Sequence, residues 1–322
     1  MTPEFALIAR YFTHRVSHTV LGVGDDAALI ATGGGRGFAV SADMLVEGRH
    51  FFRGTDPAAV GYKALAVNLS DMAAMGATPR WATLGIALPR ADERWVSAFI
   101  KGFMTLARRH GVDLIGGDTT SGPLNVCVQI IGELPLRDAL RRDGARPGDD
   151  VWVSGTLGDA ALAVAARTRR IRLSAADLQR AVRRLDRPQP RVALGLALRG
   201  IARSAVDVSD GLVADLGHIC ERSGVAAVVE FSALPVSALV RRCRGSVAGQ
   251  SALLSGGDDY ELCFTAAPAK RAAVERASAK AHTRVTRIGR VIRAPVGVCD
   301  VAVIDEHGLP LPLKGGGFDH FR

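Results

Sequence analysis

The sequence predicts an α+β protein of two domains, on three observations. Runs rich in β-branched residues are mixed with helical patterns, but not in the strict alternation of a parallel α/β fold. The length of 322 residues suits one large or two ordinary domains, and a hydrophobic fraction of 48% can fill sizeable cores. A charged stretch with Gly and Pro at 135–150 divides the strand patterns and is the predicted boundary.

The predicted elements of the first half follow from local signals. GGGRGF at 33–38 is typical of a hairpin tip, and a strand pattern follows at 37–45. A helix is predicted from Asp56, an N-cap followed by Pro57 at the first helical position, to a stop at Gly76. The remaining elements are a strand at 82–89, a helix at 93–111 and a strand at 126–135.

The second half repeats this mixture of elements. Strand patterns occupy 149–158, 225–231, 260–266 and 286–292. Helical patterns occupy 174–185, 190–202, 210–224 and 269–281.

Charge and cysteine usage narrow the class of protein. The net charge of +9 and the pI of 9.9 raise nucleic acid or anionic small molecules as partners. Aromatic residues are only 5% and do not interleave with the arginine runs, so we expect solvated helix faces and no nucleic acid. Five cysteines without a C-x-x-C, and no apolar run near the ~18 residues of a membrane span, predict a reduced, cytoplasmic protein with no membrane partner.

Aspartates recur beside glycine turns along the chain. Asp25 and Asp26 in LGVGDDAALI are explained about equally well by a turn or by a binding site. The pattern returns at Asp43, Asp71, Asp118, Asp207, Asp210, Asp258 and Asp259. Several such loops predict one shared site, where the carboxylates would repel one another unless cations neutralise them. Hard oxygen ligands favour Mg²⁺, which completes its shell with substrate phosphates, so ATP is the expected partner.

The familiar phosphate-binding loops are missing from this sequence. It contains no G-x-x-x-x-G-K-[ST] and no H-R-D or D-F-G set. GGDTTSG can cradle phosphate with backbone N–H groups, or it can be an ordinary turn after a strand, and both interpretations stay open.

Taken in order, these motifs resemble a known family. They are GVGDDAAL, VSADMLVEGRHF, NLSDMAAMGA, LIGGDTT, RPGD, VSGTLGDAA, DVSDGLVADLGHI, SGGDDYELCF and the tail GFDHF. The series is similar to thiamine-monophosphate kinase, of the aminoimidazole ribonucleotide synthetase superfamily. The resemblance extends from about Phe5 to Phe321, and NLSDMAAMGA and DVSDGLVADLGHI are its most specific blocks.

The resemblance implies a fold and an activity. Residues 1–137 would form an N-terminal domain that binds ATP and metal and pairs through its sheet in a homodimer. Residues 138–322 would form a C-terminal α+β domain that completes the active site. The implied reaction is ATP-dependent phosphorylation of thiamine monophosphate by direct in-line transfer bridged by magnesium. A phosphate acceptor is largely ionised above a second pKa of ~6, so no general base is needed.

The resemblance also implies roles for individual residues. The metal ligands would be Asp26, Ser41, Ala42, Asp43, Asp71, Asp118, Asp207 and Asp210, with Asp71, Asp207 and Asp210 carrying catalysis. Contacts to ATP would come from Gly117, Asp118, Arg142 and Ser209, and contacts to thiamine monophosphate from His50, Asp258 and Phe318.

Three of these positions depart from the family pattern. Ala42 stands where threonine is frequent, which leaves only a backbone carbonyl as a ligand. Asp258 replaces a frequent glutamate and has a shorter reach, and Phe318 replaces tyrosine or tryptophan.

Two other functions remain as alternatives. One is another ATP-dependent enzyme of the superfamily, either a ring-closing synthetase or a selenophosphate-forming enzyme, although no nucleophilic cysteine is evident near the N-terminus. The other is a basic nucleic-acid-binding protein, which would bind duplexes with steep salt dependence and without ATP.

Overall fold

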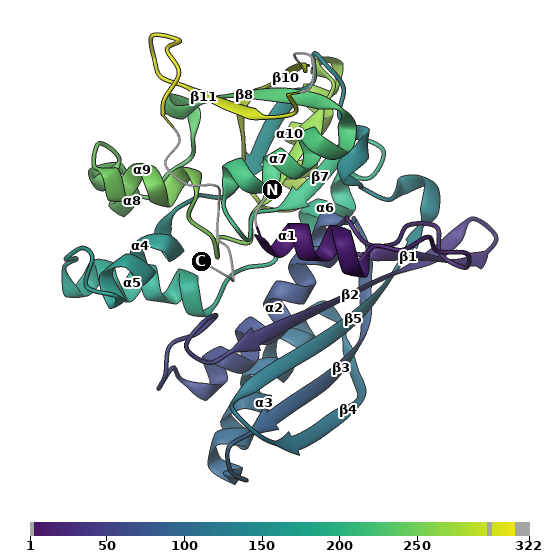
Figure 1. Ribbon diagram of the computed structural model, residues 1–322, viewed down its shortest axis with the longest axis vertical. Helices are drawn as coiled ribbons and strands as arrows, with labels where there is room; N and C mark the ends of the chain where they lie inside the picture. The colour runs from purple at the N-terminus through teal and green to yellow at the C-terminus, as the bar shows by residue number, and fades with distance from the viewer. Residues whose placement is uncertain (1–2, 295–297, 313–322) are drawn as a thin grey trace.

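The computed structural model describes residues 3–294 and 298–312, and it contains two sheets with helices packed against them (Figure 1). The first sheet has the order β1-β2-β5-β3-β4, from β1 (Ala28–Gly33), β2 (Arg36–Val46), β3 (Thr78–Leu88), β4 (Asp113–Ser121) and β5 (Asn125–Pro135). The second has the order β11-β8-β10-β6-β9-β7, from β6 (Asp150–Ser154), β7 (Ser204–Asp207), β8 (Val225–Glu230), β9 (Leu262–Ala266), β10 (Val285–Arg293) and β11 (Val301–Ile304). The predicted α+β class is confirmed.

The helices are distributed between the two halves. The first half holds α1 (Pro3–Leu7), α2 (Pro57–Ala74) and α3 (Glu93–His110). The second half holds α4 (Asp159–Arg167), α5 (Ala175–Asp186), α6 (Val192–Leu198), α7 (Leu212–Ser223), α8 (Ala238–Cys243), α9 (Val247–Leu254) and α10 (Arg271–Lys280). Within residues 3–294 and 298–312, no helix is long and apolar enough to cross a membrane.

Helix α2 starts and stops where its sequence signals predict. The side chain of Asp56 accepts a hydrogen bond from the Ala58 amide at 3.1 Å, and Pro57 occupies the first turn. Gly76 follows the last turn with φ +62, a conformation that glycine adopts at little cost. The expected N-cap, first residue and stop of this helix are therefore confirmed.

Helix α2 lies between the two sheets. It contacts β2 and β5 of the first sheet, and α6 and β7 of the second half. It also packs closely on α3, because a Cβ on Gly61 would lie 2.0 Å from the Phe99 carbonyl oxygen and one on Gly102 would lie 1.8 Å from that of Ala58. Residues near its C-terminal end are thus held at the junction of the two halves.

The first sheet has one covered face and one open face. Helices α2 and α3 lie on the covered face (Figure 1). The side chains of Ile30 and Met44 point from the other face and are 39% and 54% exposed. Phe38 on the same face meets Trp81 edge-on, with ring centroids 5.8 Å apart. The open face is therefore largely apolar.

Candidate active site

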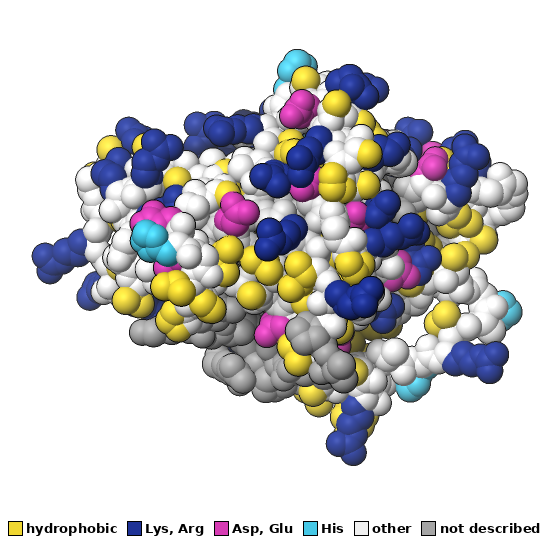
Figure 2. All heavy atoms as spheres, turned by 90° about the horizontal axis from the view of Figure 1, so that it is seen from above, with side chains coloured by type: hydrophobic (Ala, Val, Ile, Leu, Met, Phe, Trp, Pro, Cys, Tyr) yellow, Lys and Arg dark blue, Asp and Glu magenta, His cyan; other side chains and the backbone are white. Residues whose placement is uncertain are grey.

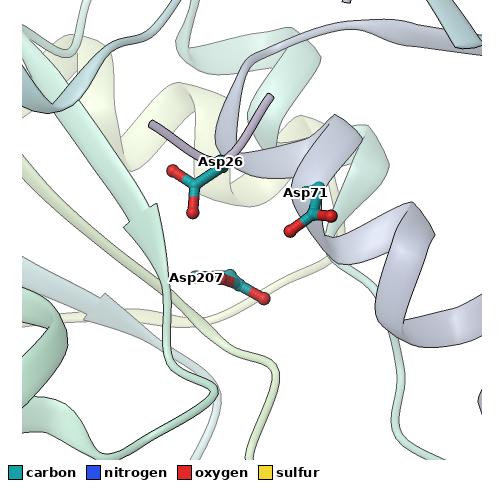
Figure 3. Close-up of side chains that lie close together, drawn as sticks. All are labelled: Asp26, Asp71 and Asp207. Carbon is teal, nitrogen blue, oxygen red and sulfur yellow. The ribbon is translucent and has the colours of Figure 1, made fainter. Parts of the chain in front are cut away.

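Three aspartates from distant parts of the chain converge where the two halves meet. Asp26 precedes β1, Asp71 lies in α2 and Asp207 ends β7. Figure 3 shows the three carboxylates directed toward one another, and one oxygen of each lies within 4.8 Å of those of the others. This spacing is suited to oxygen ligands that share cations.

Strand β2 adds two more oxygen-bearing side chains to this cluster. The Ser41 hydroxyl donates to Asp71 Oδ2 at 2.5 Å. Burial, followed by repulsion from Asp26, raises the pKa of Asp43 to about 6. Ala42 lies between them in the strand and therefore directs its side chain to the opposite face.

The electrostatics of the cluster favour the uptake of positive charge. Burial is the main cause that raises the pKa values of Asp71 and Asp207 well above the ordinary range. Repulsion from Asp43 adds to the shift of Asp71, and repulsion from Asp26 adds to that of Asp207. Because the donors are carboxylates and a hydroxyl, the set fits Mg²⁺ better than a soft metal.

Arg142 connects the two adjacent aspartates that precede β1. Its guanidinium donates to Asp26 Oδ1 at 2.6 Å, and its backbone amide donates to Asp25 Oδ2 at 3.1 Å. Asp25 also accepts from the Asp26 amide at 3.0 Å, as a turn-forming aspartate does. The pair thus divides its work, since Asp25 fixes the turn while Asp26 faces the acidic cluster.

A cavity of about 1090 Å³ adjoins the cluster, and Asp71 and Asp207 belong to both. Its lining includes five further residues that the sequence singled out, namely Asp43, Ser209, Asp210, His50 and Asp258. This volume is sufficient for a nucleotide together with a small acceptor.

A buried lysine holds His50 and Asp258, the two cavity residues predicted to contact the acceptor. Lys63 of α2 is 2% exposed, and its Nζ donates to Asp258 Oδ1 at 2.6 Å and to the His50 carbonyl at 3.0 Å. The His50 ring is fixed in turn, because its Nδ1 accepts from the Val46 amide at 2.9 Å. The Lys63 ammonium therefore fixes the positions of both residues that are predicted to contact the acceptor.

The loop that bears Asp210 is anchored by Asp215 of α7. A single oxygen, Asp215 Oδ2, accepts from the amides of Ser209, Asp210 and Gly211 at 3.0, 3.1 and 3.0 Å. Three hydrogen bonds to one buried carboxylate fix the backbone of this loop, so its side chains are presented to the cavity in a defined direction.

Some predicted residues are not brought to the cavity within one copy of the chain. Gly117 and Asp118 lie in β4, the edge strand of the first sheet, three strands away from β2. The register places Asp118 opposite Gly85 and on the open face, whereas Asp43 faces α2. Phe318 lies outside the described residues.

The sequence did not lead us to predict Lys63 or Asp215 as functional residues. A signal for Lys63 was present, because it interrupts the mostly apolar run AAVGYKALAV at 58–67, and a buried lysine requires a partner. No comparable signal marked Asp215, since its three bonds depend on the fold of the loop.

The two sheets and the acidic cavity between them match a known class of protein. Residues 24–134 match the family of the AIR synthase related protein, N-terminal domain, and residues 146–301 match that of its C-terminal domain. The thiamine-monophosphate kinase of Escherichia coli (strain K12) is 44% identical, over 99% of this chain and 98% of that protein. The chain belongs to the thiamine-monophosphate kinase family.

Solved structures agree with this assignment. Thiamine-monophosphate kinase from Stenotrophomonas maltophilia K279a is 48% identical, with a TM-score of 0.79, over 94% of this chain and 96% of that one. AaThiL complexed with AMPPCP and TMP is 30% identical, with a TM-score of 0.82, over 98% of this chain and 95% of that one. The family resemblance stated from the motifs is confirmed.

Proposed function

We propose that this protein transfers the terminal phosphoryl group of ATP to thiamine monophosphate, forming thiamine diphosphate and ADP. The observation that carries the proposal is the convergence of Asp26, Asp71 and Asp207 beside a cavity large enough for both substrates. The relatives support it, because they are thiamine-monophosphate kinases and one neighbour was solved with AMPPCP and TMP.

The acidic cluster would act by holding magnesium. The residues that would hold magnesium are Asp26, Asp43, Asp71, Asp207 and Asp210, with Ser41 and the Ala42 carbonyl beside them. Magnesium held there would offset the repulsion between the two phosphates and favour their alignment for in-line transfer. The acceptor phosphate is already largely ionised at neutral pH, since its second pKa is ~6. The chain therefore needs to position and neutralise rather than to abstract a proton.

Different residues of the cavity would contact the two substrates, and the Asp258 amide donates to the Ser209 carbonyl at 2.8 Å, so the two sets adjoin. Ser209 at the cavity, together with Arg142 and the backbone of Gly117, is proposed for ATP. His50 and Asp258 are proposed for the acceptor, because the carboxylate complements a cationic thiazolium ring. Phe318 is proposed to cover that ring.

A homodimer would bring the remaining residues to the site. In one copy, Asp118 lies on the open face of the first sheet, away from the cluster. This face is apolar because it carries Ile30, Met44 and Trp81. We propose that it packs against the same face of a second copy of the chain. The predicted N-terminal domain, residues 1–137, would then contribute metal ligands and would also form the dimer contact.

Turnover of the variants Asp71→Asn and Asp210→Asn tests the proposed function. Each should keep its fold yet lower kcat with thiamine monophosphate by at least ~10², because a misplaced cation loses charge stabilisation. Glu275→Gln is the matched control, since Glu275 is exposed in α10, which belongs neither to the cavity lining nor to the open face of the first sheet. Folded variants with near-normal rates would remove these carboxylates from the site.

Mixing inactive variants tests the proposed dimer. If Asp118 serves the partner's site, a heterodimer of Asp71→Asn and Asp118→Asn chains retains one intact site of two. Re-association of an equal mixture should then recover about a quarter of the wild-type activity, since about half of random dimers are mixed. A mixture as inactive as its parents, with dimers present by light scattering, would place Asp118 in its own chain's site or in none.

A further inference from the structure

A second, smaller cavity lies in the C-terminal half, away from the acidic cluster. It has a volume of about 210 Å³ and lies between the 3₁₀ turn Phe231–Ala233, α8, the start of β10 and the loop after β6. Its polar lining residues are Thr156, Ser232, Arg241, Arg244, Arg284 and Thr286. No aspartate or glutamate is among the described residues that line it.

The three arginines of this cavity carry uncompensated positive charge. Within the described part of the chain, neither Arg241, Arg244 nor Arg284 forms a salt bridge, whereas the neighbouring Arg242 pairs with Asp177 at 2.8 Å. Burial, and then repulsion from Arg241, lower the pKa of Arg244. The repulsion between Arg241 and Arg244 is unfavourable, and a bound anion would offset it.

Two buried polar atoms of the lining lack partners. Arg244 Nη2 and Thr286 Oγ1 are both shielded from solvent, and neither has a hydrogen-bond partner among the described residues. A buried donor without a partner destabilises the folded state, so such atoms call for an explanation. The Arg244 guanidinium is also held in place, because it lies 4.6 Å from the Phe231 ring centroid.

We propose that this cavity binds a phosphate group, either free or on a small metabolite, through Arg241, Arg244, Arg284 and Thr286. Guanidinium groups match phosphate oxygens in bidentate geometry, and threonine and serine hydroxyls supply further donors. The volume of about 210 Å³ fits a phosphate with a few attached atoms and is below the usual range for a nucleotide. The site is separate from the ATP cavity and does not depend on the proposed kinase activity.

The clustered arginines of this cavity differ from the basic side chains on the face of the molecule in Figure 2. Figure 2 shows Lys and Arg side chains spread in separate groups over the face seen from above, with hydrophobic and acidic side chains between them. A dispersed basic surface binds anions weakly and without selectivity. Three unpaired guanidiniums around one cavity, with two unpartnered buried atoms, concentrate that charge at a defined place.

Calorimetric titration of the full-length protein with inorganic phosphate tests the proposal. The buffer contains EDTA and no nucleotide, so that phosphate bridged by magnesium to the acidic cluster does not contribute. Arg284→Ala and Thr286→Val are the test variants, because an exposed arginine and an isosteric change should both fold. Arg276→Ala, an exposed arginine of α10, is the control that removes the same charge elsewhere. Parallel titrations with glycerol phosphate, diphosphate and sulfate identify the source of the anion.

We expect saturable, one-site binding to the wild type and to Arg276→Ala, weakened at least tenfold in Arg284→Ala and in Thr286→Val. Stronger binding of glycerol phosphate than of inorganic phosphate would assign the site to a small phosphorylated metabolite, and the reverse would assign it to free phosphate. The absence of saturable binding by all four anions, or equal affinities in wild type and both test variants, would overturn the proposal.

Discussion

Lys63 and Asp258 form a buried ion pair whose two partners should be unequally costly to remove. The Lys63 side chain is 2% exposed, whereas that of Asp258 is 28% exposed at the cavity. In Lys63→Met, the carboxylate can turn toward water. In Asp258→Asn, the Lys63 ammonium stays buried with only the His50 carbonyl and a neutral amide as partners. Asparagine also accepts the positive φ of this position, +69, so backbone strain is not added.

The magnitudes follow from burial. Removal of one partner from a fully buried pair costs ~3–5 kcal/mol. Because Asp258 remains partly solvated, we expect Lys63→Met to lower the free energy of unfolding by only ~1–2 kcal/mol, with methionine filling the space of the lysine stem. We expect Asp258→Asn to lower it by ~2–4 kcal/mol. The double variant should lose less than the sum, with a coupling energy of ~1–3 kcal/mol.

Urea denaturation in EDTA measures this cycle without a contribution from bound metal or nucleotide. Lys101→Met, at an exposed position of α3, is the control and should change stability by less than ~0.5 kcal/mol. Additive losses in the double variant, or a larger loss in Lys63→Met than in Asp258→Asn, would refute this account of the pair.

Three further predictions concern ligand binding, pH and packing. Magnesium with ATP at 100 times its Kd should stabilise the protein by ~2.7 kcal/mol and raise its Tm, and EDTA should abolish the shift; an equal shift in EDTA would contradict metal-bridged binding. The pKa of Asp43 is raised from 3.8 to about 6 in the native state, so between pH 3.8 and about 6 the native state keeps a proton that the unfolded chain has released. The stability of the wild type therefore falls as the pH rises through this range. In EDTA, Asp43→Asn should therefore gain stability relative to wild type by ~1–3 kcal/mol from pH 4 to pH 7, and a difference that does not change with pH would be the contrary result. Gly102→Ala should lower the free energy of unfolding by at least ~3 kcal/mol, because its Cβ would lie 1.8 Å from the Ala58 carbonyl oxygen. Gly217→Ala in α7, where nothing lies within 4 Å of the added Cβ, should raise it by ~0.4–1 kcal/mol. Similar unfolding midpoints for the two variants would contradict the packing argument.

Local signals in the sequence predicted the elements that local chemistry determines. Asp56, Pro57 and Gly76 bound α2 because capping and termination depend on the residues themselves. The GGGRGF hairpin is also confirmed, since Gly33 pairs with Arg36 across a two-residue turn.

Elements that depend on distant partners were missed or displaced. Strands β7 and β11 have only four residues each and are defined by pairing with β9 and β8. The helix expected at 210–224 begins at Leu212, because Gly211 has φ +120 and Asp215 binds the amides before it. Such short strands and turns carry too little local pattern to be predicted.

The candidate site was predicted as a set of residues rather than as a geometry. Asp26, Asp71 and Asp207 meet because a loop, a helix and a strand end converge, which no single segment reveals. The pairing of Lys63 with Asp258 likewise needs the tertiary fold. Asp118 shared the same motif pattern but lies on the other face of its sheet, so its role as a ligand stays a prediction that requires a second copy.

The most direct test of the proposed function is which acceptor the protein phosphorylates. The protein is incubated with magnesium and ATP together with thiamine monophosphate, thiamine or formylglycinamidine ribonucleotide, and the products are separated by chromatography. We predict conversion of thiamine monophosphate to the diphosphate with one ADP per product, and far slower reaction of thiamine, because its neutral hydroxyl is a poor nucleophile without a general base. Untouched thiamine monophosphate with cyclised formylglycinamidine ribonucleotide would contradict the kinase assignment.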